Sequence, residues 1–196
     1  MPKVGMEPLR RAALVDATIK EIGAKGSLDV TVSQIARRAG VSSALAHHYF
    51  GSKEQMFLAT MRHIMARYGE DVRIALAMAE TPRQRVEAVI HASFSPGNFD
   101  DAVIAAWLQF YVQAQHSDDA LRLLNIYRRR MRSNLIHDLR PLLGTGAGRV
   151  ADGLAAMVDG LYIRQALHGT APGRDTAQSL LVDYLDTQIA AQKEAR

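Results

Sequence analysis

The spacing of apolar residues restricts this chain to helices. Apolar side chains recur three and four positions apart along almost all of its 196 residues, a spacing that places them on one face of an α-helix. Runs of alternating β-branched residues, which are typical of strands, are missing. The pattern predicts an all-α fold of nine helices, three short and six longer. The expected helices cover residues 8–24, 32–39, 43–50, 53–80, 82–94, 100–115, 118–142, 148–168 and 173–192.

Three helix starts follow one another closely after residue 30. Thr31 and Ser52 each open a Ser/Thr-x-x-Gln pattern. This pattern predicts a capping box, in which the hydroxyl and the glutamine side chain satisfy backbone amides at the helix start. Ser42 is expected to cap the short helix between them, and Gly40 to take the left-handed conformation in the preceding turn.

Residues 32–50 have the pattern of a helix-turn-helix pair, with Ile35 facing inward and the small Ala36 where the two helices approach closely. Such a pair is typical of DNA-reading domains, but a plain helical hairpin within a bundle has the same spacing. The charge distribution favours DNA binding. Residues 1–62 hold nine Lys or Arg against five Asp or Glu, whereas residues 63–196 hold fifteen of each. All of the net charge of +4 therefore lies where it favours contact with phosphates.

The composition excludes several kinds of functional site and several classes of protein. The sequence contains no cysteine, which excludes disulfides, thiolate zinc sites and a cysteine nucleophile. Without a secretory signal or the roughly 18 consecutive apolar residues of a membrane span, we expect a soluble, cytoplasmic protein. An enzyme is the main rival, but the seven histidines are scattered, and no HExxH motif, phosphate loop or nucleophile elbow is present. No metal or cofactor is expected, and the basic N-terminal third disfavours a helical adaptor that does not bind DNA.

Two segments carry a family resemblance. Residues 35–42 (IARRAGVS) and 48–53 (HYFGSK) closely resemble the signature of the TetR family of bacterial repressors. The resemblance implies a DNA-binding domain at 1–52 and a ligand-binding and dimerisation domain at 53–196, joined by the helix 53–80. It also implies a homodimer formed by the last two helices, which would place two heads on a pseudo-palindromic, double-stranded operator.

Further segments are similar to one branch of this family, the choline-responsive repressors of glycine betaine synthesis genes. These segments are residues 1–6 with Arg10 and Arg11, 106–108, 153–156, 159–161 and Arg164. The resemblance implies a repressor of the choline-to-glycine-betaine pathway in osmotic stress, with choline as its effector. A repressor that senses another small cationic or hydrophobic ligand is the alternative. Both release from DNA and action while bound to DNA are consistent with this family.

The resemblance also assigns the residues that contact DNA. The second short helix would lie in the major groove, whereas hydroxyls, a phenol and an ammonium around it would meet phosphates. The expected groove residues are Ser43, Ala44, His47 and His48, and the expected phosphate contacts are Thr31, Ser33, Tyr49 and Lys53. His47 and Gln55 depart from the residues common in the family, which leaves the operator sequence open.

An aromatic stripe marks the expected effector site. Trp107 and Tyr111 lie four positions apart on one helix face, where a packed core stripe is the alternative reading. The resemblance to a choline sensor favours a ligand site, because aromatic faces bind quaternary ammonium ions. Phe94, Phe99 and Tyr127 are the further candidates for an aromatic cage. Asp159 would balance the charge, unless it pairs with an arginine at the dimer contact.

Overall fold

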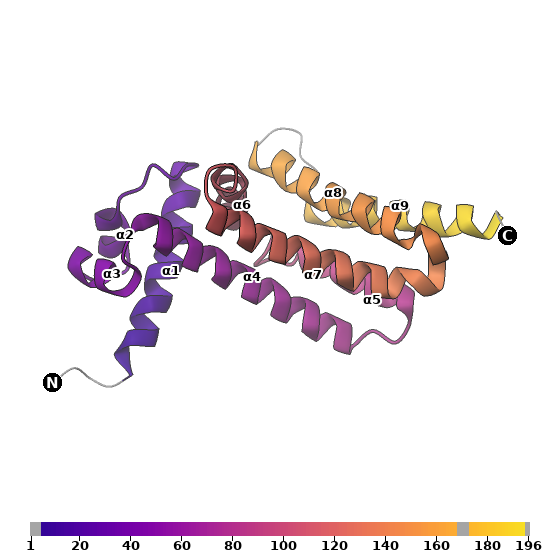
Figure 1. Ribbon diagram of the computed structural model, residues 1–196, viewed down its shortest axis with the longest axis horizontal. Helices are drawn as coiled ribbons and strands as arrows, with labels where there is room; N and C mark the ends of the chain where they lie inside the picture. The colour runs from indigo at the N-terminus through magenta and orange to yellow at the C-terminus, as the bar shows by residue number, and fades with distance from the viewer. Residues whose placement is uncertain (1–4, 168–172, 195–196) are drawn as a thin grey trace. The chain divides into compact units, whose positions relative to one another are not determined.

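The computed structural model describes residues 5–167 and 173–194. Over these residues the chain forms nine α-helices and one 3-10 turn without any strand, which confirms the all-α prediction (Figure 1). The helices are α1 (Met6–Lys25), α2 (Val32–Arg38), α3 (Ser43–Phe50), α4 (Lys53–Ala77), α5 (Pro82–Ser93), α6 (Asp101–Gln113), α7 (Asp118–Leu143), α8 (Ala147–Ala166) and α9 (Arg174–Glu194). Residues 1–4, used for the resemblance, and His168, the expected end of one helix, lie outside the described residues.

The helix α4 ends at Ala77, earlier than the expected Glu80. Arg85 of α5 donates from Nη1 to the carbonyl of Leu76 at 3.3 Å and from Nε to the buried Asp138 of α7 at 2.7 Å. The two N–H groups after Ala77 donate to carbonyls three residues back, as in a 3-10 turn. The end of α4 is thus set by an arginine of the next helix, which helix periodicity does not reveal.

The described helices gather into two compact units. The first consists of residues 1–65 and 101–121, and the second of 66–100 and 122–196. The helix α4 therefore contributes its first half to one unit and its second half to the other. The functional boundary expected between residues 52 and 53 stays a prediction.

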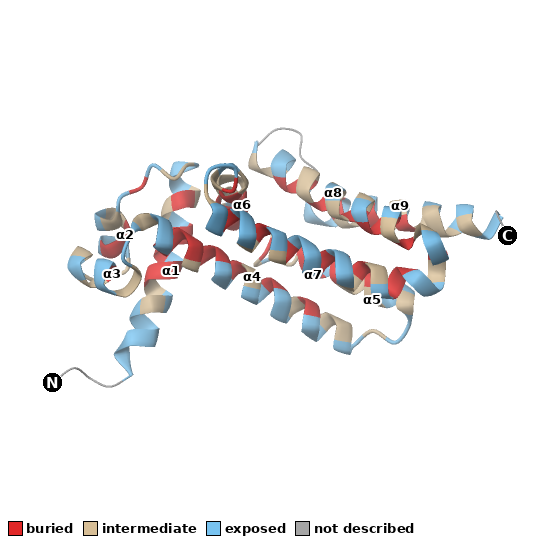
Figure 2. Cartoon of the chain, in the orientation of Figure 1, coloured by how far each residue is buried: buried red, intermediate tan, exposed pale blue. Residues whose placement is uncertain are grey.

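The first unit is built around the contact of α1 with α6. A Cβ atom at Gly23 would lie only 2.4 Å from the Cβ of Ala102, so the methyl group of Ala102 on α6 packs directly against the backbone of α1. The side chains that fill this core come from α1, α2, α4 and α6 and are almost fully buried (Figure 2). They include Leu14, Ile22, Ile35, Met61 and Phe110.

The second unit packs α5, α7, α8, α9 and the end of α4. Gly153 lets α8 approach α9, because a Cβ there would meet the Tyr184 hydroxyl at 2.5 Å. Leucines and valines of these helices are buried, among them Leu139, Val150, Leu154 and Leu181, and the buried stretches of the helices are red in Figure 2. Ile163 of α8 and Leu180 of α9 are 42% and 44% exposed. None of the described helices is long and apolar enough to cross a membrane.

Candidate DNA interface and effector site

The helix pair α2 and α3 has the capping that the sequence predicts. The Thr31 hydroxyl accepts from the Gln34 amide at 3.2 Å, and Gln34 Oε1 accepts from the Thr31 amide at 2.8 Å. Ser42 accepts from the Leu45 amide at 3.2 Å. Gly40 has φ 69°, in the left-handed region that favours glycine. These contacts start both helices at fixed residues and confirm the predicted turn.

The exposed face of α3 carries the residues expected to enter the major groove. Ala44, His47 and His48 are exposed, and the half-exposed Ser43 donates to the Ser33 hydroxyl at 3.1 Å. His47 Nδ1 lies 2.8 Å from the carbonyl of Gly51, so its ring is held against the end of the helix. The structure therefore brings these four residues together on one surface of the first unit.

Lys53 and Tyr49, which are expected to contact phosphates, are held in place by interactions within the protein. The Lys53 ammonium donates to the carbonyl of Leu28 at 3.2 Å. Arg11 of α1 donates to the carbonyl of Tyr49 at 2.8 Å, and its guanidinium lies 5.1 Å from the centre of the Tyr49 ring. Neither helix spacing nor the family signature assigns Arg11 to the interface, because α1 and α3 are distant in sequence. This arginine adds positive charge beside Tyr49 and orients its ring.

Trp107 and Tyr111 lie side by side on α6, in the first unit. Trp107 is buried, and its ring centre is 5.9 Å from that of Tyr111 and 5.9 Å from that of Phe110. The predicted stripe therefore exists as an aromatic group, with Phe110 fully buried behind it.

The other expected effector residues belong to the second unit, where Phe94 is part of an aromatic cluster. The ring centre of Phe94 lies 5.1 Å from that of Phe99 and 5.9 Å from that of Tyr162, and the last two are 5.6 Å apart. The Tyr162 hydroxyl donates to the carbonyl of Ser93. Tyr162 was not predicted from the sequence, although it lies three residues after Asp159 on α8, a spacing that places both on one face.

A carboxylate and a second aromatic pair complete the surroundings of this cluster. Burial raises the pKa of Tyr162, and Tyr68 and Asp159 raise it further because negative charge on either would repel the Tyr162 phenolate. The ring centre of Tyr127 lies 5.6 Å from that of Tyr68, whose hydroxyl is 3.4 Å from the Ser93 hydroxyl. Burial raises the pKa of Tyr68 to about 12. Tyr68 and Tyr162 are therefore neutral near pH 7, and the acidic side chain of Asp159 lies close enough to act on Tyr162.

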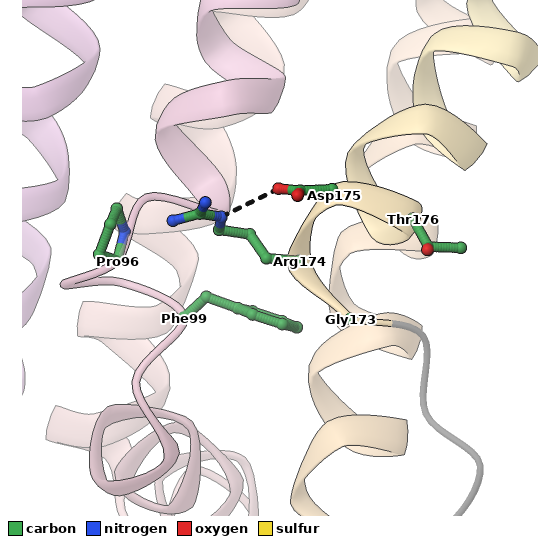
Figure 3. A pocket seen from close by; sticks show the side chains of 6 residues that line it. All are labelled: Pro96, Phe99, Gly173, Arg174, Asp175 and Thr176. Carbon is green, nitrogen blue, oxygen red and sulfur yellow. Dashed lines mark hydrogen bonds and ion pairs between the residues drawn. The ribbon is translucent and has the colours of Figure 1, made fainter.

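An open cavity borders the cluster at Phe99 (Figure 3). It has a volume of about 450 Å³ and is also lined by Pro96 and by residues 173–176 at the start of α9. Arg174 and Asp175 form an ion pair of 3.2 Å on its wall, and the side chain of Phe99 extends below them toward Gly173 (Figure 3). No group of three or more His, Cys, Asp or Glu side chains suited to a metal ion occurs among the described residues.

Comparison with protein families decides the class of the molecule. Residues 14–60 match the family of bacterial regulatory proteins called tetR, and residues 82–190 match the BetI-type transcriptional repressor C-terminal domain. The chain belongs to the TetR family of bacterial regulators. It is a DNA-binding transcriptional regulator and not an enzyme, as the sequence predicts. Regulators of this family bind operator DNA, form dimers and bind a small-molecule effector.

Curated relatives match over the whole chain. The HTH-type transcriptional regulator BetI of Brucella anthropi is 54% identical over 194 residues, which cover 98% of this chain and 100% of that protein. The regulator of the same name from Agrobacterium fabrum is 52% identical over 190 residues, covering 96% and 92%. These relatives place the TetR-family regulator within the BetI type.

Solved structures share the fold. A transcriptional regulator from Pseudomonas aeruginosa PAO1 has a TM-score of 0.80 and 25% identity, covering 96% of this chain and 95% of its own. A regulator from Saccharomonospora viridis, crystallised in complex with choline, has a TM-score of 0.82 and 21% identity, covering 92% and 97%. Both confirm the TetR-like arrangement of helices.

Proposed function

We propose that this TetR-family regulator represses genes of the choline-to-glycine-betaine pathway and that choline is its effector. The observation that carries the proposal is the cluster of Phe94, Phe99 and Tyr162 with Asp159 beside it in the second unit. The BetI names of its relatives and the choline bound to a structural neighbour support the same ligand.

The chemistry of the cluster suits a quaternary ammonium ion. Such a cation donates no hydrogen bonds, so it binds best to aromatic faces, each of which contributes about 0.5–2 kcal/mol. The Phe94 side chain is fully buried and Tyr162 nearly so, which removes water that would compete for the cation. Asp159 supplies the opposite charge. An effector contact at Trp107 and Tyr111 of α6 stays a separate prediction from the sequence.

The helix α4 offers a route from effector to DNA. It begins with Lys53, an expected phosphate contact, and carries Tyr68, which contacts Tyr127 and Ser93, in its second half. We assume two conformations of the protein that differ in the position of α4, only one of which binds operator DNA. An effector that binds one conformation more tightly than the other changes the fraction of molecules that can bind DNA. By linkage, operator DNA must then change choline affinity by the same factor.

Calorimetric titration of the purified protein tests the ligand. Choline is compared with glycine betaine and with 3,3-dimethylbutan-1-ol, which has the shape of choline without its charge. We expect saturable heat with choline and none with the neutral alcohol, because the aromatic faces attract the positive charge. Binding of the alcohol with the affinity of choline would show a hydrophobic site and contradict the proposal.

Single substitutions then locate the site. Tyr162→Leu and Phe94→Leu should each weaken choline binding by about 2- to 30-fold, the equivalent of one cation–π contact. Trp107→Leu tests the tryptophan of the predicted aromatic stripe. Val112→Leu on α6, an exposed position, is the matched control and should bind choline like the original protein. Unchanged affinity in both cluster variants would remove the cluster from the site.

A further inference from the structure

The turn that follows α5 rests on one face of α4. Asp71 Oδ2 of α4 accepts from the Ser95 hydroxyl at 3.1 Å and from Asn98 Nδ2 at 2.9 Å. Gly97 packs against Arg67, one helical turn earlier on α4, because a Cβ at Gly97 would lie 2.5 Å from the Arg67 guanidinium. The turn therefore contacts α4 through both hydrogen bonds and close packing.

This turn is also rigid within itself. Asn98 is only 4% exposed, and its amide group donates to Asp71 and to the carbonyl of Ala92 at the end of α5. The backbone amides of Asn98 and Phe99 both donate to the carbonyl of Ser95, at 3.0 and 2.8 Å. A displacement of one part of the turn must therefore move the whole of it.

The same turn carries two rings of the aromatic cluster. Phe94 precedes it and Phe99 ends it, and both contact Tyr162. With ring centres 5.1–5.9 Å apart, the rings fill the space between them, so a cation can enter only if they separate. That separation moves the turn relative to α8, while the carboxylate of Asp71 holds the turn to α4.

We propose that Asp71 is the positioning residue that transmits effector binding from the Phe94–Phe99 turn to α4. Hydrogen bonds to a carboxylate are roughly twice as strong as neutral ones, and a carboxylate left without donors in this half-buried place is costly. The turn and α4 therefore move together. This inference rests on the proposed function, since it assumes that choline binds at the cluster.

The test measures coupling rather than affinity alone. Choline is titrated into the full-length protein with and without a saturating palindromic DNA duplex, which the protein itself selects from a randomised library. The ratio of the two dissociation constants is the coupling factor, typically about 5–150. In Asp71→Asn we expect the coupling factor to fall at least about fivefold, while choline affinity without DNA stays within about threefold of the original.

Two further variants make the result specific. Glu70→Gln removes a neighbouring carboxylate that pairs with Arg73 on the exposed side of α4, and its coupling factor should not change. Ser95→Ala removes one donor to Asp71 and should lower the coupling factor by a smaller amount, which keeps the test decisive if Asp71→Asn unfolds. A coupling factor unchanged in folded Asp71→Asn or in Ser95→Ala overturns this inference alone, whereas absence of choline binding to the original protein overturns the proposed function.

Discussion

The ammonium of Lys53 uses one of its three N–H groups inside the protein, on the carbonyl of Leu28. The other two suit a phosphate oxygen, so Lys53→Ala should weaken binding to all operator sequences alike. It should also reduce the slope of log affinity against log salt concentration by about one. Lys20→Ala, which removes an exposed lysine paired with Asp16 on α1, is the control. Equal salt slopes for the two variants would exclude Lys53 from the interface.

His47 is the residue of α3 most suited to read a base. Its Nδ1 faces the carbonyl of Gly51, and a carbonyl only accepts, so Nδ1 carries the hydrogen and Nε2 of the neutral ring is an acceptor. An acceptor in the major groove pairs with the amino group of adenine or cytosine.

We therefore expect His47→Ala to relax the preference at one base pair in each half-site, with a loss of about 1 kcal/mol for the preferred base. Binding to duplexes that vary one position at a time measures this effect. Ser33→Ala, at an expected phosphate contact, should instead weaken all duplexes equally. A full set of base preferences retained in His47→Ala would contradict the assignment.

The sequence predicts the contacts that form between near neighbours in the chain. The Thr31 box, the Ser42 cap and the Gly40 turn all involve residues within four positions, and the structure has each of them. Arg11 beside Tyr49 and Tyr162 against Phe94 join residues that are distant in sequence. Neither spacing nor composition indicates such contacts.

Among the elements, α1 and α6 depend on glycine at their closest point. Gly23→Ala should destabilise the protein by about 1–3 kcal/mol, because the new Cβ would overlap Ala102 and force the two helices apart.

Gly69→Ala in α4 is the opposite case, since nothing lies within 4 Å of the added methyl group. It should stabilise the protein by about 0.5–1 kcal/mol through helix propensity. Urea unfolding of both variants measures these changes, and stabilisation by Gly23→Ala would contradict the close packing.

The start of α5 and the end of α4 show which helix boundaries the sequence can predict and which it cannot. The start of α5 is fixed by Thr81 and Pro82, which are local signals, and it lies where the sequence predicts. The end of α4 depends on Arg85, whose partners Leu76 and Asp138 come from two other helices. Apolar periodicity continues past Ala77 in the sequence, so only the folded structure reveals the earlier end.

For the whole molecule, family membership predicts a dimer that carries two DNA-binding heads on one operator. The exposed Leu180 of α9 and Ile163 of α8 lie on the two helices expected to form the contact. A charge at Leu180 would be buried without a partner in such a contact, which is strongly unfavourable. Leu180→Glu should therefore yield monomers in sedimentation experiments.

The loss of the dimer should also weaken operator binding. Two linked heads bind a palindrome about 10²–10⁴ times more tightly than one head, because the second contact is intramolecular. We expect Leu180→Glu to lose at least about a hundredfold in operator affinity, while its affinity for a single half-site stays unchanged. Met78→Glu, which changes the highly exposed Met78 after α4, is the control and should remain dimeric. A dimeric Leu180→Glu with full operator affinity would place the dimer contact on another surface.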